Sequence, residues 1–182
     1  MATETKQRIE AGTYSVDPVH SHIGFAVVHN GVSTFRSGFS GYQAKLVGGE
    51  HPSLTGTVEV DSIDIDEPQL RGHLLSPDFF DVERNPRLEF RSTELVVGED
   101  GSVRIRGELE IGGTVRQVEA SGRYADVGAD LAGSARVGIS LETTVDRREF
   151  GLEWNAELPS GGEVLDYDVR IEVGLELVKE DE

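Results

Sequence analysis

The feature of this chain that most constrains its fold is a long alternation near the carboxyl end, LDYDVRIEVGLEL, residues 165–177. Every second position is apolar, and the positions between carry mainly Asp, Glu and Arg. Successive side chains of a strand point to opposite faces, so this pattern predicts one antiparallel strand with a buried face and a solvent face. At about 3.3 Å per residue the strand spans roughly 40 Å, which is typical of a barrel rather than a sandwich. The positions expected to face the interior are Leu165, Tyr167, Val169, Ile171, Val173, Leu175 and Leu177.

Other segments repeat the alternation and are joined by short turns. The run SVRIRGELEI is followed by Gly112-Gly113, a strong two-residue hairpin signal, and Glu99-Asp100-Gly101 predicts a second hairpin. Further strands are expected at about 13–17, 21–29, 38–47, 54–65 and 132–145. The sequence therefore predicts an all-β fold, an up-and-down antiparallel β-barrel of about eight strands.

One segment, DEPQLRGHLLSPDFFDVERNP, interrupts the strand pattern. Pro68 marks the start of a short helix, and Ser76-Pro77-Asp78 predicts the N-cap and first turn of a second one. A short helical insert of this kind could close one end of the barrel.

Composition limits the classes of function. The 182 residues indicate one domain, and the net charge of −17 without a basic stripe argues against nucleic-acid binding. With no cysteine, disulfides and cysteine-based zinc or nucleophile sites are excluded. No apolar run is long enough for a membrane span, so stable membrane insertion is not expected. The segment MATETKQRIEAGTY lacks the apolar core of a signal peptide, which favours a cytoplasmic location, and residues 1–12 are expected to be flexible.

Bulky aromatic side chains are the best candidates for a ligand-binding lumen. An eight-stranded barrel is just wide enough to be filled by side chains or to hold one small ligand. Either an ordinary packed core or a slim apolar lumen would use these residues. They are Phe25, Phe35, Phe39, Phe79, Phe80, Phe90, Phe150 and Trp154.

The stretch DPVHSHIGF raises the question of a metal, because His20 and His22 would share one face of a strand. The remaining histidines lie in distant segments, and no carboxylate follows the pair at the spacing of a cupin-type site. We therefore expect no metal and no cofactor. Instead, Asp17, His20 and Ser21 are expected to form a side-chain network at the strand entrance, with a role of the histidines in capping a ligand head group left open.

The stretch DRREF offers a second polar candidate. Its charged residues Asp146, Arg147, Arg148 and Glu149 could hold a phosphate by bidentate contacts, although a structural Asp146–Arg147 pair that pins a loop is favoured. No arrangement of Ser, His and Asp matches a hydrolase pattern, so the protein is not expected to be an enzyme.

Five blocks, taken in order, resemble the YceI-like family of polyisoprenoid-binding proteins: YSVDPVHSHIGFAVVH, VDSIDI, HLLSPDFFDVERNPRLEFRST, GELEIGGTVRQV and DRREFGL. The resemblance implies a single barrel domain over residues 1–182 with a lipocalin-like fold and a long isoprenoid chain bound inside. The chain departs from the family pattern in two places: Leu70-Arg71 replaces the usual Arg-Asp, and Asn85 replaces a frequent aromatic residue.

Together these observations predict a soluble lipid-binding protein that sequesters a polyisoprenoid or an isoprenoid-quinone-like ligand for transport or storage. The candidate binding residues are the eight aromatic residues named above together with His20, His22 and Arg147. Two alternatives stay open: a barrel enzyme that uses His20 or His22 for acid–base chemistry, and a ligand-free stress-response or oligomerisation module. A homodimer is also left open.

Overall fold

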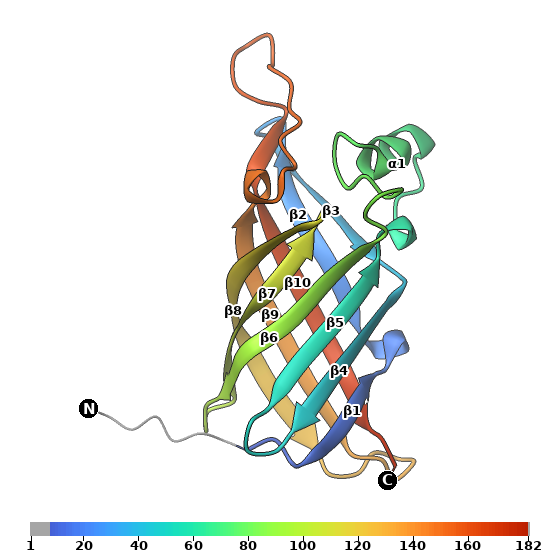
Figure 1. The fold of residues 1–182 in the computed structure, drawn as a ribbon, viewed down its shortest axis with the longest axis vertical. Helices are drawn as coiled ribbons and strands as arrows, with labels where there is room; N and C mark the ends of the chain where they lie inside the picture. The colour runs from blue at the N-terminus through green and yellow to red at the C-terminus, as the bar shows by residue number, and fades with distance from the viewer. Residues whose placement is uncertain (1–7, 182) are drawn as a thin grey trace, which may run out of the picture.

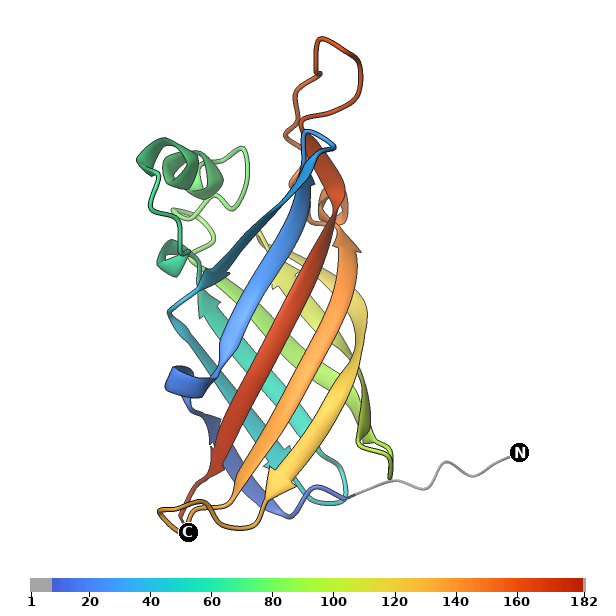
Figure 2. The same cartoon turned by 180° about the vertical axis from the view of Figure 1, so that it is seen from behind.

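The structure, a computed structural model, describes residues 8–181, and within them ten antiparallel strands form one sheet (Figures 1 and 2). The strand order is β1-β4-β5-β6-β7-β8-β9-β10-β2-β3, and an additional pairing of β1 with β10 closes an eight-stranded barrel. The strands are β1 (Gly12–Val16), β2 (His22–His29), β3 (Ser33–Phe39), β4 (Tyr42–Gly48), β5 (Ser53–Glu59), β6 (Arg87–Val97), β7 (Ser102–Ile111), β8 (Thr114–Val127), β9 (Arg136–Asp146) and β10 (Leu165–Lys179). The predicted all-β antiparallel barrel is confirmed.

The helices gather mainly at one end of the barrel, which we call the upper end (Figure 1). They are α1 (Pro68–Leu75) and the 3-10 helices η1 (Pro18–His20), η2 (Val60–Ser62) and η3 (Arg147–Phe150). The lower end carries the turns after β4, β6 and β8.

The β1 and β2 strands lie one after the other along the same side of β10. Val16 is opposite Leu177 in the lower half, whereas Phe25 is opposite Ile171 in the upper half. The η1 helix separates the two strands, so the upper half of the barrel gains the β2–β3 hairpin as part of its wall.

Both predicted hairpins are present. Gly112 and Gly113 have φ angles of 59° and 77°, which is the conformation that the tight turn between β7 and β8 needs and that other residues rarely adopt. The predicted helix at Pro68 is also present: Glu67 caps it by accepting hydrogen bonds from the N–H groups of Gln69 and Leu70.

Several predicted boundaries were wrong. The expected strand 38–47 is split into β3 and β4 around residues 40–41, the strand 54–65 ends at Glu59, and the strand 132–145 begins at Arg136. The second helix predicted at Ser76 is absent, because Ser76 caps the carboxyl end of α1 in an extended conformation before Pro77. The residues after it form turns that aim Phe79 and Phe80 toward the interior.

The flexible amino terminus was predicted over residues 1–12. Residues 1–7 lie outside the described residues. Within residues 8–12, the Ile9 side chain is buried at the lower end and its carbonyl accepts a hydrogen bond from the Gly49 N–H, whereas Arg8, Glu10 and Ala11 are exposed. An apolar side chain at this position closes the lower end of the barrel.

Two groups of buried apolar residues occupy the two halves. The lower core consists of Ile9, Tyr14, Ala44, Leu46, Leu54, Leu95, Val97, Val103, Ile105, Tyr124, Val137, Ile139, Leu141, Leu175 and Leu177. The upper cluster consists of Phe39, Val58, Val60, Ile63, Leu74, Phe79, Phe80, Phe150 and Leu152. In residues 8–181, no helix is both long and apolar enough to cross a membrane.

Candidate ligand-binding cavity

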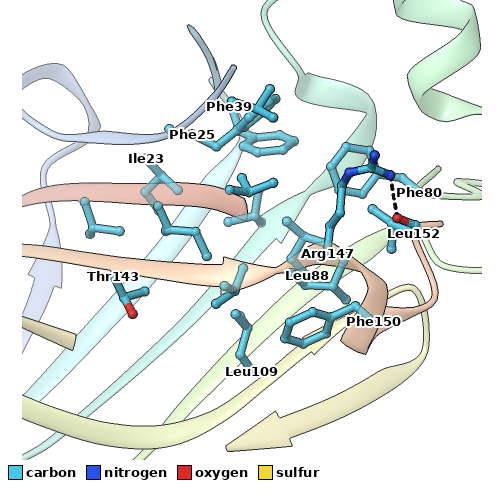
Figure 3. A pocket seen from close by; sticks show the side chains of 18 of the residues that line it. Ile23, Phe25, Phe39, Phe80, Leu88, Leu109, Thr143, Arg147, Phe150 and Leu152 are labelled. Atoms are coloured by element: carbon cyan, nitrogen blue, oxygen red, sulfur yellow. Dashed lines mark hydrogen bonds between the residues drawn. The ribbon is translucent and has the colours of Figure 1, made fainter. Parts of the chain in front are cut away.

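A cavity of about 640 Å³ lies between the two groups of buried residues and reaches into the upper half of the barrel (Figure 3). Strands from all around the barrel line it, together with α1, η3 and the segment after η3. The wall is almost entirely apolar. Its volume falls in the range of ordinary small-molecule sites.

All eight aromatic residues singled out in the sequence lie in the cavity wall. Phe25 of β2 contacts both Phe35 and Phe39 of β3, with ring centroids 6.2 and 6.0 Å apart. Ser37 is the direct partner of Phe25 across the hairpin, so the two β3 phenylalanines are its diagonal neighbours on the same face. Phe39 continues the contact to Phe80 at 6.1 Å. The hairpin and the insert thus form one aromatic wall.

The β10 strand presents its apolar face to the interior, as its alternation predicts. Leu165, Val169, Ile171, Val173 and Leu175 line the cavity, and Leu177 is buried in the lower core. Glu172, on the opposite face, pairs with Arg36 at 3.2 Å and with Arg170 at 2.9 Å.

Tyr167 is the exception, since it does not line the cavity. The pairing of β10 with β2 shifts register between Leu165 and Val169, which interrupts the alternation there. The Tyr167 hydroxyl donates a hydrogen bond to Glu163 at 2.7 Å, and its ring lies under the guanidinium groups of Arg147 and Arg148, at 4.6 and 4.1 Å.

Arg147 is a buried cation in the cavity wall, with only 4% of its surface exposed (Figure 3). Its guanidinium donates hydrogen bonds to four backbone carbonyls, those of Leu152, Trp154, Leu165 and Asp166, at 2.7 to 3.1 Å. Among residues 8–181 no carboxylate forms an ion pair with it. Burial lowers the pKa of Arg147 from its usual value.

The expected Asp146–Arg147 pair is therefore wrong. Asp146 instead caps η3 and pairs with Arg148 at 2.7 Å, and the pKa of Asp146 is lowered by this hydrogen bond. Arg148 points to solvent while Arg147 turns inward, so Arg147 fixes the segment after η3 through its carbonyls rather than through a carboxylate.

His73 lies at the upper end of the cavity among aromatic rings, and the sequence interpretation did not single it out. Its ring packs edge-on against Trp154 at 4.7 Å and against Phe79 at 5.1 Å, and its Nε2 lies 3.0 Å from the Asp78 carboxylate. The signal that could have found it is helical spacing, because Leu70, His73 and Leu74 share one face of α1 and all three line the cavity.

The upper half is widened where β8 and β9 separate. Their pairing stops at Ser121 and Glu142, and above this point Thr143 bridges the strands through a 2.7 Å hydrogen bond from its hydroxyl to the Glu119 carbonyl. The η3 helix contacts both strands here and buries Phe150. Cavity and lower core therefore differ in strand pairing as well as in side chains.

The structure does not bring His20 and His22 to the cavity. His20 belongs to η1 rather than to the strand, so the expected shared face does not exist. His22 is exposed at the start of β2 and lies over Gly24 and Gly38 on the outer side of the hairpin.

Of the predicted network at the strand entrance, the Asp17–His20 contact is present, whereas Ser21 bonds to the backbone of Glu176 and not to Asp17 or His20. The Asp17 carboxylate accepts a hydrogen bond from the Val19 N–H, lies 2.9 Å from His20 Nδ1 and pairs with Arg136 at 2.8 Å. The Ser21 hydroxyl accepts a hydrogen bond from the Glu176 N–H and donates one to its carbonyl.

These contacts also fix the charges of the network. The hydrogen bonds from His20 and Arg136 hold the pKa of Asp17 far below its usual value, and Asp17 raises the pKa of His20. Possible ligand atoms of Asp17, His20 and Glu176 lie within 4.8 Å of one another, but Arg136 already pairs with both carboxylates. The network joins η1 to β9 and β10.

Comparison with known proteins identifies the family to which this chain belongs. The YceI-like domain matches residues 14–177. The chain belongs to the YceI-like family. It is 27% identical to a UPF0312 protein of Pseudomonas putida over 94% of this chain and 86% of that protein. It is 28% identical to a UPF0312 protein of Staphylococcus epidermidis, over 90% of this chain and 95% of that one.

Solved structures share the YceI-like barrel. BcnA of Burkholderia cenocepacia superposes with a TM-score of 0.74 at 17% identity, over 88% of this chain and 98% of BcnA. A polyisoprenoid binding domain from Saccharophagus degradans, implicated in plant cell wall breakdown, superposes with a TM-score of 0.67 at 13% identity, over 92% of this chain and 98% of that domain. At these identities the likeness establishes the fold.

Proposed function

We propose that this YceI-like protein binds a polyisoprenoid or an isoprenoid-quinone-like lipid in the cavity and holds it for transport or storage. The observation that carries the proposal is a cavity of about 640 Å³ whose wall is almost entirely apolar and rich in aromatic rings. The Saccharophagus degradans domain, described as polyisoprenoid-binding, has the same fold and supports this ligand class.

Burial of the chain supplies the affinity. Each methylene moved from water into an apolar lumen contributes about 0.8 kcal/mol, so about ten of them contribute roughly 8 kcal/mol before the costs of binding. A branched, unsaturated chain also suits a wall in which the rings of Phe25, Phe35, Phe39 and Phe80 are tilted against one another.

A polar head group belongs at the upper end in this proposal. Arg147 carries a positive charge that no described carboxylate neutralises, and His73 and Trp154 lie on the same side of the cavity. A carbonyl, hydroxyl or phosphate of the lipid would meet these residues while the chain extends downward between the strands.

Binding is favoured over catalysis because the cavity wall is almost entirely apolar. His20 and His22, the candidates for acid–base chemistry, are outside the cavity wall. The proposed activity needs no cofactor.

The test is to extract the natively purified protein with organic solvent and identify the released lipids by mass spectrometry. We expect an isoprenoid in near-stoichiometric amount, or saturable uptake of one by the delipidated protein. Delipidated, folded protein that takes up no prenyl lipid at tens of micromolar would refute the proposal.

A further inference from the structure

The cavity does not run the length of the barrel. Five residues line it and also belong to the lower core, and we call them the floor: Ala44, Leu54, Ile105, Leu141 and Leu175. They come from β4, β5, β7, β9 and β10, so they span the barrel interior from strands on different sides.

The layer beneath the floor is buried from solvent. Leu46 and Leu177 have no exposed surface, and Tyr14 and Ile139 are 1% exposed. Two tyrosines of this layer are held by hydrogen bonds, Tyr14 to the Glu10 carbonyl at 3.1 Å and Tyr124 to the Asp126 carboxylate at 3.0 Å. A lipid chain that pushed deeper would have to displace packed side chains and uncover polar groups.

We propose that the floor acts as a ruler for chain length, which rests on the proposed lipid-binding function. A methylene-sized group occupies about as much space as one water molecule does in liquid water, about 30 Å³. The cavity of about 640 Å³ therefore holds roughly 20 carbons, or about four isoprene units. Units beyond these must leave through the upper end. There each unit transfers less apolar surface from water into the protein, so it adds little affinity.

A series of prenyl alcohols tests the ruler directly. The delipidated protein is titrated with alcohols of two, three, four, five and eight isoprene units, delivered from one cyclodextrin carrier. We expect affinity to rise by about tenfold or more per unit up to four or five units, and then to change by less than about threefold up to eight.

The possible outcomes separate the two proposals. An equally steep rise from five to eight units would overturn the ruler and leave lipid binding in place. Absence of saturable binding at every length would overturn the proposed function and the ruler with it.

Floor variants sharpen the test in both directions. Ile105→Ala removes three side-chain carbons from the floor, about half an isoprene unit, and should move the plateau toward longer chains by at most about one unit. Ala44→Leu raises the floor and should move it toward shorter chains. Because either variant could lose stability, each is compared after its folding has been checked by circular dichroism.

The matched control is Val115→Ala, which removes bulk from the exposed outer side of β8. It should leave the length of the plateau unchanged. A plateau that moves equally in Val115→Ala and Ile105→Ala would show that the shift does not come from the floor, and would overturn the ruler.

Discussion

The upper and lower halves of the barrel are built from the same long strands but are filled differently. On β10, Leu177 is fully buried in the lower half, whereas Val169 and Ile171 are half-buried and face the cavity. Both sets belong to one continuous alternation. The comparison teaches that the alternation fixes which face points inward, while cross-barrel packing decides whether that face supports stability or binding.

The two halves of the barrel also differ in strand pairing. In the lower half β8 pairs with β9, and β1 joins β10 to β4. In the upper half β8 and β9 separate, and η3 packs where the pairing ends. Four predictions test this contrast.

The largest effect is expected from Ile171→Asp. It places a carboxylate in the apolar cavity, where an unpaired charge costs several kcal/mol, and should unfold the protein or abolish lipid binding. Glu172→Gln, on the outer face of the same strand, should stay within about 1 kcal/mol, because it removes only partly exposed ion pairs. Urea unfolding and lipid uptake measure both. A harmless Ile171→Asp together with a damaging Glu172→Gln would reverse the assignment of faces.

The next prediction compares the truncation of one buried side chain in the lower half with that of one cavity-lining side chain in the upper half. Leu177→Ala should lower the free energy of unfolding by about 2–5 kcal/mol, because it opens a hole in a buried layer. Val169→Ala should cost less than about 1.5 kcal/mol in the absence of lipid, because it enlarges a space that already exists. Equal losses in urea unfolding would contradict the division into a packed and a hollow half.

A smaller loss is expected from Arg147→Met. The change leaves four carbonyls without their buried donor and should cost about 1–3 kcal/mol. Hydrogen exchange should rise in residues 151–166. Arg148→Met, which removes a half-exposed pair with Asp146, is the control and should cost less than about 1 kcal/mol. If the control loosens the segment as much as Arg147→Met does, Arg147 is not what holds it.

The smallest effect concerns pH. Because Asp17 raises the pKa of His20 above its unfolded value, the pair stabilises the protein fully below about pH 6.5, and this contribution is lost as the pH rises through the raised pKa. Between pH 5.5 and 8.5 the melting temperature should therefore fall slightly more for the wild type than for His20→Gln. The difference is small because the His20 side chain is exposed. Parallel curves, or a wild type that gains relative stability with rising pH, would contradict it.

Sequence predicted the meander, both hairpins and, except at Tyr167, the inward face of β10, because these follow from local periodicity and turn chemistry. The aromatic residues were chosen for their bulk, and the sequence left open whether they fill a core or line a lumen. It did not predict the depth of the cavity, since Ala44 and Ile105 meet there from strands far apart in the chain. The partners of Arg147 are backbone carbonyls, which carry no sequence signature. The sequence also did not predict that His20 lies in the η1 helix, and for this reason His20 and His22 do not share a strand face.

The central claim, that the upper half of the barrel is a lipid site, is tested most directly by a pair of tryptophan variants on β8. Ala120 faces the cavity, whereas Val115 is exposed on the outside of the same strand. Saturable uptake of a four-unit prenyl alcohol by delipidated protein should drop at least tenfold in Ala120→Trp and stay within about twofold of the wild type in Val115→Trp. Equal uptake by folded Ala120→Trp and wild type would show that the lipid does not enter this cavity.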